Sequence, residues 1–462
     1  MISAQVLSAS QMRAAEQALF DAGISVDDLM EHAAGGAAEW IRRVAAGRAV
    51  TVLCGPGNNG GDGYVIARRL AEAGNPVRVV APLAPATDAA RAARARWGRA
   101  VATTAEHGGE VFVDCLFGSG LTRPLSDQHA GLLGALAARH RIRIAVDLPS
   151  GIATDSGEAL NRGLPSYHLT LALGAWKFAH WSLPGRLAMG QLRLVPIGIA
   201  EVDGAAQLIG KPHLAVPPAD SHKYRRGLLT IIAGAMPGAS LLAAHAAQGA
   251  GAGYVKLLGD MPPACTPPEL VCETAPLEEA LADKRIAAVL IGQGLGREAN
   301  ARARLQTAFA SNLPLVLDAD ALMLLKPSML PADRPMLATP HDGELAALAQ
   351  AFGVSAPHRR EAVGALARAS GMVIIAKGPD TLVAAPDGRL ALAPPASSWL
   401  SVAGTGDVLA GIAASRMATG ADPFTAACEA VWLHGEAARK AGSAFTPSEL
   451  AEKVSEALAT CL

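Results

Sequence analysis

The stretch VTVLCGPGNNGGDG at residues 50–63 decides the fold of the first half of the chain. Its opening VTVLC is a short apolar run rich in β-branched residues, which is typical of a buried strand. Gly55, Gly57 and Gly60 in the following turn match G-x-G-x-x-G, a pattern that lets backbone amides approach a phosphate at a helix start. We expect that helix to begin near Gly63. A strand, a glycine-rich turn and a helix in this order predict a parallel α/β domain.

The same stretch departs from two common phosphate-binding motifs. It is not a P-loop, because no Gly-Lys-Ser/Thr follows the glycines. An ordinary dinucleotide fold places an acidic residue at the end of the next strand, but residues 77–81 read VRVVA. Asn58, Asn59 and Asp62 put three polar side chains among the glycines, which suits coordination of a ligand or cation. The alternative is that these side chains only form Asx turns.

Strands and helices alternate on both sides of this motif. The alternation predicts parallel βαβ units and a Rossmann-like three-layer αβα domain. The expected strands are residues 50–53, 77–80, 111–113 and 142–146. The helices that follow them are expected to begin near Gly63, Thr87 and Asp127. Two further helices, broken near Gly23, are expected within residues 8–46.

Two further strand ends carry polar chemistry. Residues 113–121 read VDCLFGSGL and residues 146–151 read VDLPSG, so that Asp114 and Asp147 each follow a short apolar run. The carboxyl ends of parallel strands meet at one edge of a sheet, where ligands bind. The sequence therefore predicts one pocket formed by the glycine-rich turn and these two segments.

Residues 1–205 resemble the NAD(P)H-hydrate epimerase family in three motifs. The signature loop of the family is matched at residues 55–63, its VD-x-(L/I)-(F/L)-G-(T/S)-G-L segment at 113–121, and its D-(I/L)-P-S-G segment at 147–151. The resemblance implies binding of the hydrated forms of NADH and NADPH, called NADHX and NADPHX. The residues that it implies in substrate binding are Asn58, Asn59, Gly60, Gly61, Asp62, Gly118, Ser119, Gly120, Leu121, Thr122, Arg123, Pro124 and Asp147.

The resemblance also implies a potassium ion held by Asn59, Asp114 and Ser150. Ligands that are all oxygens suit a hard monovalent cation. Epimerisation at the hydrated ring carbon requires either proton transfer or reversible ring opening, and a positioned carboxylate can serve both. Asp147 is the first candidate for this catalytic group, and Asp62 is the second.

In the second half of the chain, residues 401–411 read SVAGTGDVLAG, a glycine-rich turn directly before an apolar helix. Backbone amides at a helix N-terminus stabilise a transferring phosphoryl group, and an adjacent aspartate can take the proton from the attacking hydroxyl. Asp407 is the candidate catalytic base. The alternative is that Asp407 only caps the helix, a contribution of about 1 kcal/mol.

Residues 215–462 resemble the ribokinase-like superfamily and, within it, the ADP/ATP-dependent NAD(P)H-hydrate dehydratases. Six segments carry the resemblance, namely residues 223–227, 292–296, 317–322, 339–344, 377–378 and 404–407. The resemblance implies a ribokinase-like αβα domain that uses ADP or ATP with Mg²⁺, with Asp318 and Asp320 as magnesium candidates or turn residues. It implies substrate binding by Ala239, Gly294, His341 and Asp407, and nucleotide binding by Lys377, Gly378, Pro379, Asp380, Thr381, Gly404, Thr405 and Gly406.

This half departs from the family pattern in two places. Many members read Gly-Asn-Pro-Gly-Met-Ala before the anion-hole glycines, whereas residues 398–403 here read SWLSVA. The loop at residues 234–239 also looks shorter than usual. These departures concern nucleotide preference and contacts of the substrate loop, while Asp407 and its glycines match.

The chain is long enough for two domains, because one hydrophobic core rarely grows beyond about 250–300 residues and this chain has 462. The segment at residues 201–224 contains three prolines and lies between two alternating series, which predicts domains at 1–210 and 211–462. The formal net charge of −1 offers no basic surface for nucleic acid. We therefore expect small-molecule partners only, and a homo-oligomer.

The start of the chain has no secretory signal pattern. The weakly charged run at residues 237–255 contains His245 and Gln248, so we expect a buried helix there rather than a membrane span. None of the six cysteines, Cys265 among them, lies in a C-x-x-C pair, which fits a reducing cytoplasm.

Together the two halves predict one bifunctional repair enzyme. The first half interconverts the R and S hydrates, and the second dehydrates the S form through phosphorylation and elimination of phosphate. One alternative is a vitamin or sugar kinase with an accessory domain, because the Gly-Thr-Gly-Asp turn alone does not separate stable phosphorylation from phosphorylation followed by elimination. Another is that the first half only binds a nucleotide or RNA end without turnover.

Overall fold

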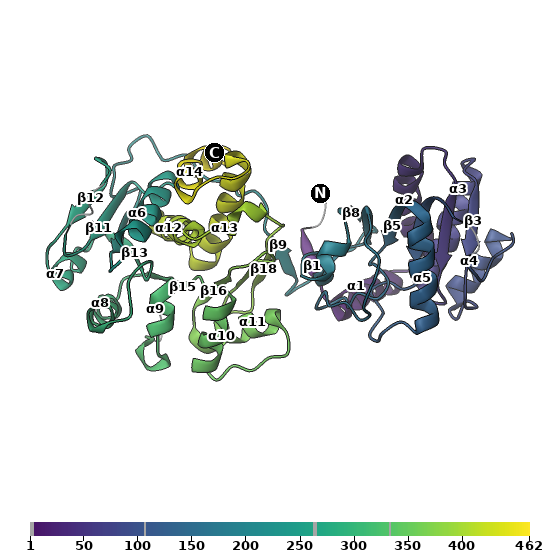
Figure 1. Cartoon of the computed structure of the whole chain (residues 1–462), viewed down its shortest axis with the longest axis horizontal. Helices are drawn as coiled ribbons and strands as arrows, with labels where there is room; N and C mark the ends of the chain where they lie inside the picture. Colours follow the sequence, from purple (N-terminus) through teal and green to yellow (C-terminus); the bar gives the residue numbers. More distant parts are fainter. Residues whose placement is uncertain (1–3, 106–107, 262–265, 332–333) are drawn as a thin grey trace. The chain divides into compact units, whose positions relative to one another are not determined.

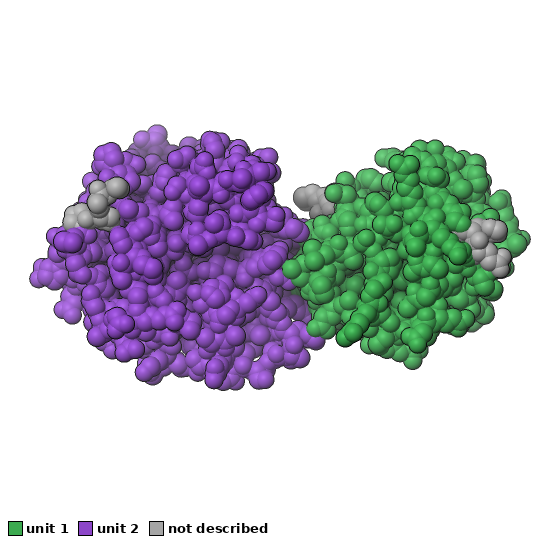
Figure 2. Space-filling model, viewed as in Figure 1, with its two compact units in different colours: residues 1–206 green, residues 207–462 purple. Residues whose placement is uncertain are grey.

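The computed structural model describes residues 4–105, 108–261, 266–331 and 334–462. The chain divides into two compact units, Met1–Ala206 (unit 1) and Gln207–Leu462 (unit 2), which Figure 2 shows in green and purple. The sequence placed the boundary after residue 210. Each unit has its own sheet and its own hydrophobic core, and the predicted α/β class is confirmed in both.

The sheet of unit 1 is parallel throughout, in the strand order β3-β2-β4-β5-β6-β8. The strands are β2 (Val50–Cys54), β3 (Val77–Val80), β4 (Gly109–Cys115), β5 (His140–Val146), β6 (Leu169–Leu173) and β8 (Gln191–Val195). The register sets Cys54 opposite Cys115 and Asp114 opposite Ala145, so the carboxyl ends of β2, β4 and β5 lie level. A short parallel pair, β1 (Gln5–Leu7) and β7 (Trp176–Lys177), also belongs to this unit.

Helices cover both faces of this sheet. One core is formed by α1 (Ala9–Asp21), α2 (Val26–Ala45), α3 (Asn58–Glu72) and α4 (Asp88–Trp97) against residues such as Val52 and Val113. The other core is formed by α5 (Asp127–Arg139) against Leu53 and Phe112, which point to the opposite face because side chains alternate along a strand. These layers give the predicted three-layer αβα arrangement.

Helix α3 begins at Asn58, so the predicted start near Gly63 is wrong. Glycine is a poor helix former, but close packing requires it here. A Cβ atom at Gly60 would lie 1.9 Å from the carbonyl oxygen of Gly55, and one at Gly63 would lie 2.8 Å from the Cys54 sulfur. The segment Asn-Asn-Gly-Gly-Asp-Gly is therefore the first turns of a helix that packs directly on the strand ends.

The sheet of unit 2 runs in the order β12-β11-β10-β13-β14-β15-β16-β17-β18-β9. It is parallel from β12 to β16 and antiparallel through β16, β17 and β18. The strands are β9 (Ala206–Leu208), β10 (Leu228–Ile232), β11 (Tyr254–Leu258), β12 (Val271–Glu273), β13 (Ile286–Ile291), β14 (Leu315–Leu317), β15 (Met336–Ala338), β16 (Val373–Ala376), β17 (Leu382–Ala384) and β18 (Leu390–Leu392).

Helix α12 is the centre of the unit 2 core. Figure 1 shows α6 (Pro237–Gly249), α12 (Thr405–Ala418) and α13 (Pro423–Ala441) on one side of the sheet. On the other side lie α8 (Ala299–Ala310), α9 (Ala319–Leu324), α10 (Asp342–Ala351) and α11 (Arg359–Ser370). A Cβ atom at Gly411 would lie 2.2 Å from the carbonyl oxygen of Ala243, so glycine is needed where α12 crosses α6.

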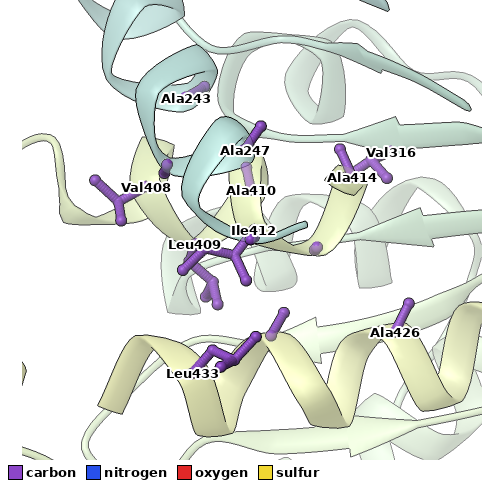
Figure 3. Close-up of a cluster of buried hydrophobic side chains, with 14 of the residues drawn as sticks. Ala243, Ala247, Val316, Val408, Leu409, Ala410, Ile412, Ala414, Ala426 and Leu433 are labelled. Carbon is purple, nitrogen blue, oxygen red and sulfur yellow. The ribbon is translucent and has the colours of Figure 1, made fainter. Parts of the chain in front are cut away.

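Small side chains let these helices approach closely, and larger ones fill the remaining space. Figure 3 shows Ala247 of α6 beside Ala410 of α12, and Leu409 and Ile412 of α12 on the side facing Leu433 of α13. Ile412 is fully buried, so its replacement by Ala would cost about 2–5 kcal/mol. This core fixes the first turn of α12, which carries Asp407.

Among the residues that the structure describes, no helix is long and apolar enough to cross a bilayer. The run at residues 237–255 forms α6 and the start of β11, as a buried helix and its exit. Cys54, Cys115, Cys272, Cys428 and Cys461 are free thiols. Cys265 lies outside the described residues.

Candidate active sites

Asp147 lies at the centre of the unit 1 site, directly after β5. It has φ +65°, a left-handed conformation that is strained for a residue with a side chain. Two hydrogen bonds fix its backbone. The amide of Asp147 donates to the carbonyl of Leu171 at 2.7 Å, and His180 Nε2 donates to the carbonyl of Asp147 at 2.8 Å. Its carboxylate accepts from Lys177 Nζ at 2.5 Å and from the amide of Ser119 at 2.9 Å.

Lys177 is a site residue that sequence reasoning missed. It is 1% exposed and its ammonium also donates to the carbonyl of Leu173 at 2.5 Å. The backbone amide of Lys177 donates to Nδ1 of His180, so the imidazole of His180 carries its proton on Nε2. Burial, and after it the charge of Lys177, lowers the pKa of His180 to about 4. A signal was present: a lone cation in the apolar stretch LTLALGAWKFAHW, residues 169–181, is costly unless it is paired.

Two carboxyl groups of this site have pKa values shifted in opposite directions. Asp62, in the first turns of α3, is 8% exposed. Burial raises its pKa well above the usual value, and the charges of Asp147 and Glu16 add to the effect. Burial also opposes ionisation of Asp147, but the charge and hydrogen bond of Lys177 hold its pKa below the usual value. The two carboxyl groups therefore differ in acidity, with Asp62 the weaker acid and Asp147 the stronger.

A second polar cluster lies at the ends of β4 and β5. Asp114 is fully buried and accepts from the Ser150 hydroxyl at 2.7 Å, the Ser150 amide at 3.0 Å and the Tyr167 hydroxyl at 2.5 Å. Burial raises its pKa, and these hydrogen bonds oppose the shift. The Ser150 hydroxyl also lies 3.1 Å from the carbonyl oxygen of Phe117. Sequence reasoning missed Tyr167.

The amide of Asn59 and the backbone of Gly118 lie beside the carboxylate of Asp147. A Cβ atom at Gly118 would lie 2.9 Å from Asp147 Oδ2 and 3.3 Å from Asn59 Oδ1. Asn59 Nδ2 is buried and has no hydrogen-bond partner among the described residues. The structure thus brings together Asn59, Asp62, Gly118, Ser119 and Asp147. Five predicted site residues are instead exposed, namely Asn58, Gly120, Thr122, Arg123 and Pro124.

In unit 2 the candidate anion hole is the first turn of α12. Gly404 caps this helix with φ +102°, which favours glycine, and no side chain caps it. Asp407 lies in the first turn of this helix and not at its N-cap. Burial raises the pKa of Asp407 to about 7, with a further contribution from Asp318 and an opposing one from Lys377. A carboxylate that titrates near neutral pH suits a general base.

Lys377 lies between this turn and an acidic pair. Its ammonium is 2.8 Å from Asp318 Oδ1 and 4.0 Å from Glu344 Oε2. A Cβ atom at Gly406 would lie 3.3 Å from this nitrogen, so the ammonium reaches the anion-hole backbone. The Thr339 hydroxyl donates to the same oxygen of Asp318 at 2.5 Å. Asp320 instead holds the loop before α8, accepting from the Gly296 amide and from Arg297.

The segment after Lys377 is a tight turn. The Thr381 hydroxyl donates to the carbonyl of Gly378 at 2.7 Å. Arg359, which sequence reasoning missed, donates to the carbonyls of Lys377 and Asp380 at 3.0 and 2.9 Å. The turn is thereby fixed beside the anion hole, with Pro379 between these contacts.

The remaining predicted residues of unit 2 have structural contacts. Nδ1 of His341 accepts from the Gly343 amide at 3.0 Å, and the side chain is 61% exposed, so this residue caps α10. Ala239 and Gly294 are neighbours, because a Cβ atom at Gly294 would lie 3.1 Å from that of Ala239. The hydroxyl of Thr405 donates to the carbonyls of Leu400 and Val402, so it holds the preceding loop.

Comparisons with known proteins cover both units. A family model described as NAD(P)H-hydrate dehydratase matches residues 229–460, and one described as YjeF-related protein N-terminus matches residues 26–179. A ribokinase-like superfamily protein from Enterococcus faecalis is structurally similar, with a TM-score of 0.50 and 21% identity. The match covers 57% of this chain and 98% of the chain of that protein. It shows that unit 2 has the ribokinase-like fold.

Two relatives span nearly the whole chain. The bifunctional NAD(P)H-hydrate repair enzyme Nnr of Gloeobacter violaceus is 35% identical over 94% of this chain and 92% of its own. The enzyme of the same name from Salinibacter ruber is 31% identical over 96% of this chain and 93% of its own. With an epimerase-type unit followed by a dehydratase-type unit, this chain belongs to the family of bifunctional NAD(P)H-hydrate repair enzymes.

Proposed function

We propose that unit 1 interconverts the R and S hydrates of NADH and NADPH by reversible ring opening. The observation that carries this mechanism is the pair of carboxyl groups whose pKa values are shifted in opposite directions, lowered in Asp147 by Lys177 and raised in Asp62 by burial. Asp147 accepts the proton of the ring hydroxyl while the adjacent carbon–nitrogen bond breaks, and Asp62 supplies a proton to the departing nitrogen. Closure on the other face of the new carbonyl gives the other epimer. Ring opening needs both an acid and a base, which this site contains.

The proposed contacts to the hydrated nucleotide come from the segments around these carboxyl groups. They are Asn58 to Asp62, Gly118 to Pro124 and Asp147. The amides at the start of α3 would face the phosphates of the nucleotide, because a helix N-terminus carries partial positive charge.

We propose a potassium ion at Asn59, Asp114 and Ser150. Asp114 is a fully buried carboxylate, and the donors that the structure describes around it are neutral. A buried charge without a cation is costly, so a monovalent cation fits this set of oxygens. The side-chain oxygen of Asn59 is the proposed third ligand, whereas its unpartnered Nδ2 is a hydrogen-bond donor that cannot bind a cation. Bound there, potassium would neutralise Asp114 and hold the ends of β4 and β5 together.

For unit 2, the proposed reaction is dehydration of the S hydrate with ADP or ATP. Asp407 takes the proton of the ring hydroxyl, and the resulting oxygen attacks the terminal phosphoryl group. The amides of Gly404, Thr405 and Gly406 and the ammonium of Lys377 stabilise that group. ADP leaves from ATP, or AMP from ADP, and elimination of phosphate with loss of a proton from the neighbouring ring carbon then restores the nicotinamide ring. The observation that carries this assignment is the position of Asp407, with a pKa of about 7, in the first turn of α12.

The remaining proposed contacts in unit 2 are divided between the hydrate and the nucleotide. The hydrate would contact Ala239, Gly294 and His341, and the nucleotide would contact the turn from Lys377 to Thr381. Mg²⁺ would arrive on the nucleotide phosphates, because the Asp318 carboxylate is already paired with Lys377, and the described residues form no acidic metal cluster. A homo-oligomeric state and a cytoplasmic location stay predictions.

The first experiment supplies each purified hydrate separately, with ADP or with ATP, in buffers with and without potassium. Restored NAD(P)H and free phosphate in equal amounts are expected from the S hydrate in both buffers. Conversion of the R hydrate should fall when potassium is removed. A stable phosphorylated product would instead indicate the alternative, a kinase. Equal loss of both reactions without potassium would contradict the proposed cation site.

A further inference from the structure

The loop that precedes α12 carries an exposed tryptophan. Trp399 lies in the short 3₁₀ turn Ser398–Leu400 and is 51% exposed, and its neighbour Val402 is also exposed. An indole exposed to this extent retains much of its hydrophobic driving force for binding another surface. This is the stretch SWLSVA, in which the sequence departs from the family pattern.

The two ends of this loop adjoin the two proposed nucleotide-binding segments. At one end, the amide of Ala393 donates to the carbonyl of Thr381 at 3.0 Å. At the other end, Gly404 begins the anion hole. The loop from residue 393 to residue 404 therefore connects the turn after Lys377 with the phosphate-binding start of α12.

Hydrogen bonds anchor the backbone of the turn at residues 398–400, while the indole of Trp399 remains exposed to solvent. The Thr405 hydroxyl donates to the carbonyls of Leu400 and Val402, at 2.8 and 2.9 Å. The Trp399 amide donates to the hydroxyl of Ser397 at 3.3 Å, and Leu400 packs against the hydrophobic core. An exposed aromatic ring on an anchored turn offers a stacking surface for a flat ligand, because the backbone loses little conformational entropy on binding.

We propose that Trp399 is a specificity-determining residue of unit 2, on which the adenine base of ADP or ATP stacks. The inference rests on the proposed function and adds the base-binding contact to it. Phosphates at the start of α12 place the nucleoside on the adjoining loop, and a purine presents a flat aromatic face. Stacking of a base on an aromatic side chain contributes about 1–3 kcal/mol in nucleic-acid complexes, or roughly five- to 150-fold in affinity.

The test compares Trp399→Ala, Trp399→Phe and Val216→Ala in the full-length protein. Val216 is an exposed apolar residue of the same unit and serves as the control. The expected result is a KM for ADP and ATP about tenfold higher in Trp399→Ala, an unchanged KM for the S hydrate, and recovery in Trp399→Phe. ATP without hydrate should quench tryptophan fluorescence of the wild type and of Val216→Ala, but much less that of Trp399→Phe. Inorganic tripolyphosphate, which has no base, should bind the wild type and Trp399→Ala equally.

Three outcomes would overturn the inference. An unchanged nucleotide KM in an active Trp399→Ala enzyme would show that the ring does not contact the base. A higher KM for the hydrate alone would place the adenine of the dinucleotide, rather than that of the phosphoryl donor, on Trp399. If Trp399→Ala weakened the binding of tripolyphosphate as much as the binding of the nucleotide, the substitution would have damaged the anion hole. A wild type without any dehydration would refute the proposed function itself, which is a different result.

Discussion

At the scale of single residues, the charge state of Asp147 depends on one buried cation. Lys177→Met keeps an unbranched apolar stem but leaves the buried carboxylate without its partner, a change that costs about 3–5 kcal/mol. Because the pKa of Asp147 then rises, a higher pH is needed to ionise it. We expect epimerisation to fall at neutral pH and to recover partly at alkaline pH, measured as the pH profile of R-hydrate conversion.

Folding must be separated from catalysis in that variant. The double variant Lys177→Met with Asp147→Asn removes both charges, so it should regain thermal stability but not epimerisation. Dehydration of the S hydrate by unit 2 is the internal control. A pH profile of Lys177→Met identical to that of the wild type would contradict the assigned role of the pair.

The base of unit 2 gives a second prediction at this scale. The pKa of Asp407 is raised to about 7, so its basic form is lost as the pH falls through 7. We expect kcat/KM for the S hydrate to decrease below that pH. Asp407→Asn should reduce dehydration by about 10²- to 10⁴-fold and abolish this pH dependence, because an amide cannot accept the proton. An unchanged acidic limb in Asp407→Asn would assign the titration to another group.

Site residues were predictable where they belong to a continuous motif. Asp147, Asp62 and Asp407 stand in such motifs, and the structure places each at a strand end or a helix start. Lys177 and Arg359 were missed because they act over long separations in sequence, 30 residues from Asp147 and 18 residues from Lys377. Only the folded chain shows which acidic group or carbonyl each of them meets.

At the scale of secondary-structure elements, the start of α3 depends on glycines that permit close packing. Gly60→Ala would place a methyl group 1.9 Å from a backbone oxygen that cannot move freely. This overpacking costs about 1–3 kcal/mol or more, and displacement of α3 would misplace Asp62. We expect a lower melting temperature and loss of epimerisation.

Gly57→Ala is the matched control because it adds the same methyl group to the same motif. Gly57 has φ −89° and no atom within 4 Å of its Cβ position, so this substitution should retain activity. The two variants are compared by thermal unfolding and R-hydrate conversion. Equal losses would show that the motif is sensitive to any side chain rather than to close packing.

Elements with strong apolar runs were predicted closely, and short ones were missed. The range of β3 is the one expected from its apolar residues. Strands such as β17 and β18 have three residues each, too few to show a period, and they form only because β16 supplies an edge on which to pair. Helix α3 was expected to start late because glycine has a low helix propensity. It starts earlier because tertiary packing overrides that propensity.

At the scale of the whole molecule, the chain combines an epimerase unit with a dehydratase unit. A stereospecific dehydratase alone recovers only the S hydrate, so the epimerase makes the R hydrate available to it. Each unit has its own sheet and core, so each reaction should depend on residues of one unit only. Two full-length variants, each inactivated in one unit, should therefore complement each other in a mixture.

The most direct measurement is the recovery of reduced nicotinamide absorbance from a mixture of R and S hydrates with ADP or ATP. We expect Asp147→Asn to recover only the S fraction, Asp407→Asn to recover nothing, and the two variants together to recover the whole mixture. Interconversion without enzyme provides the baseline. A mixture of variants that recovers no more than Asp147→Asn alone, or any substantial recovery by Asp407→Asn, would contradict the division of the two reactions between the units.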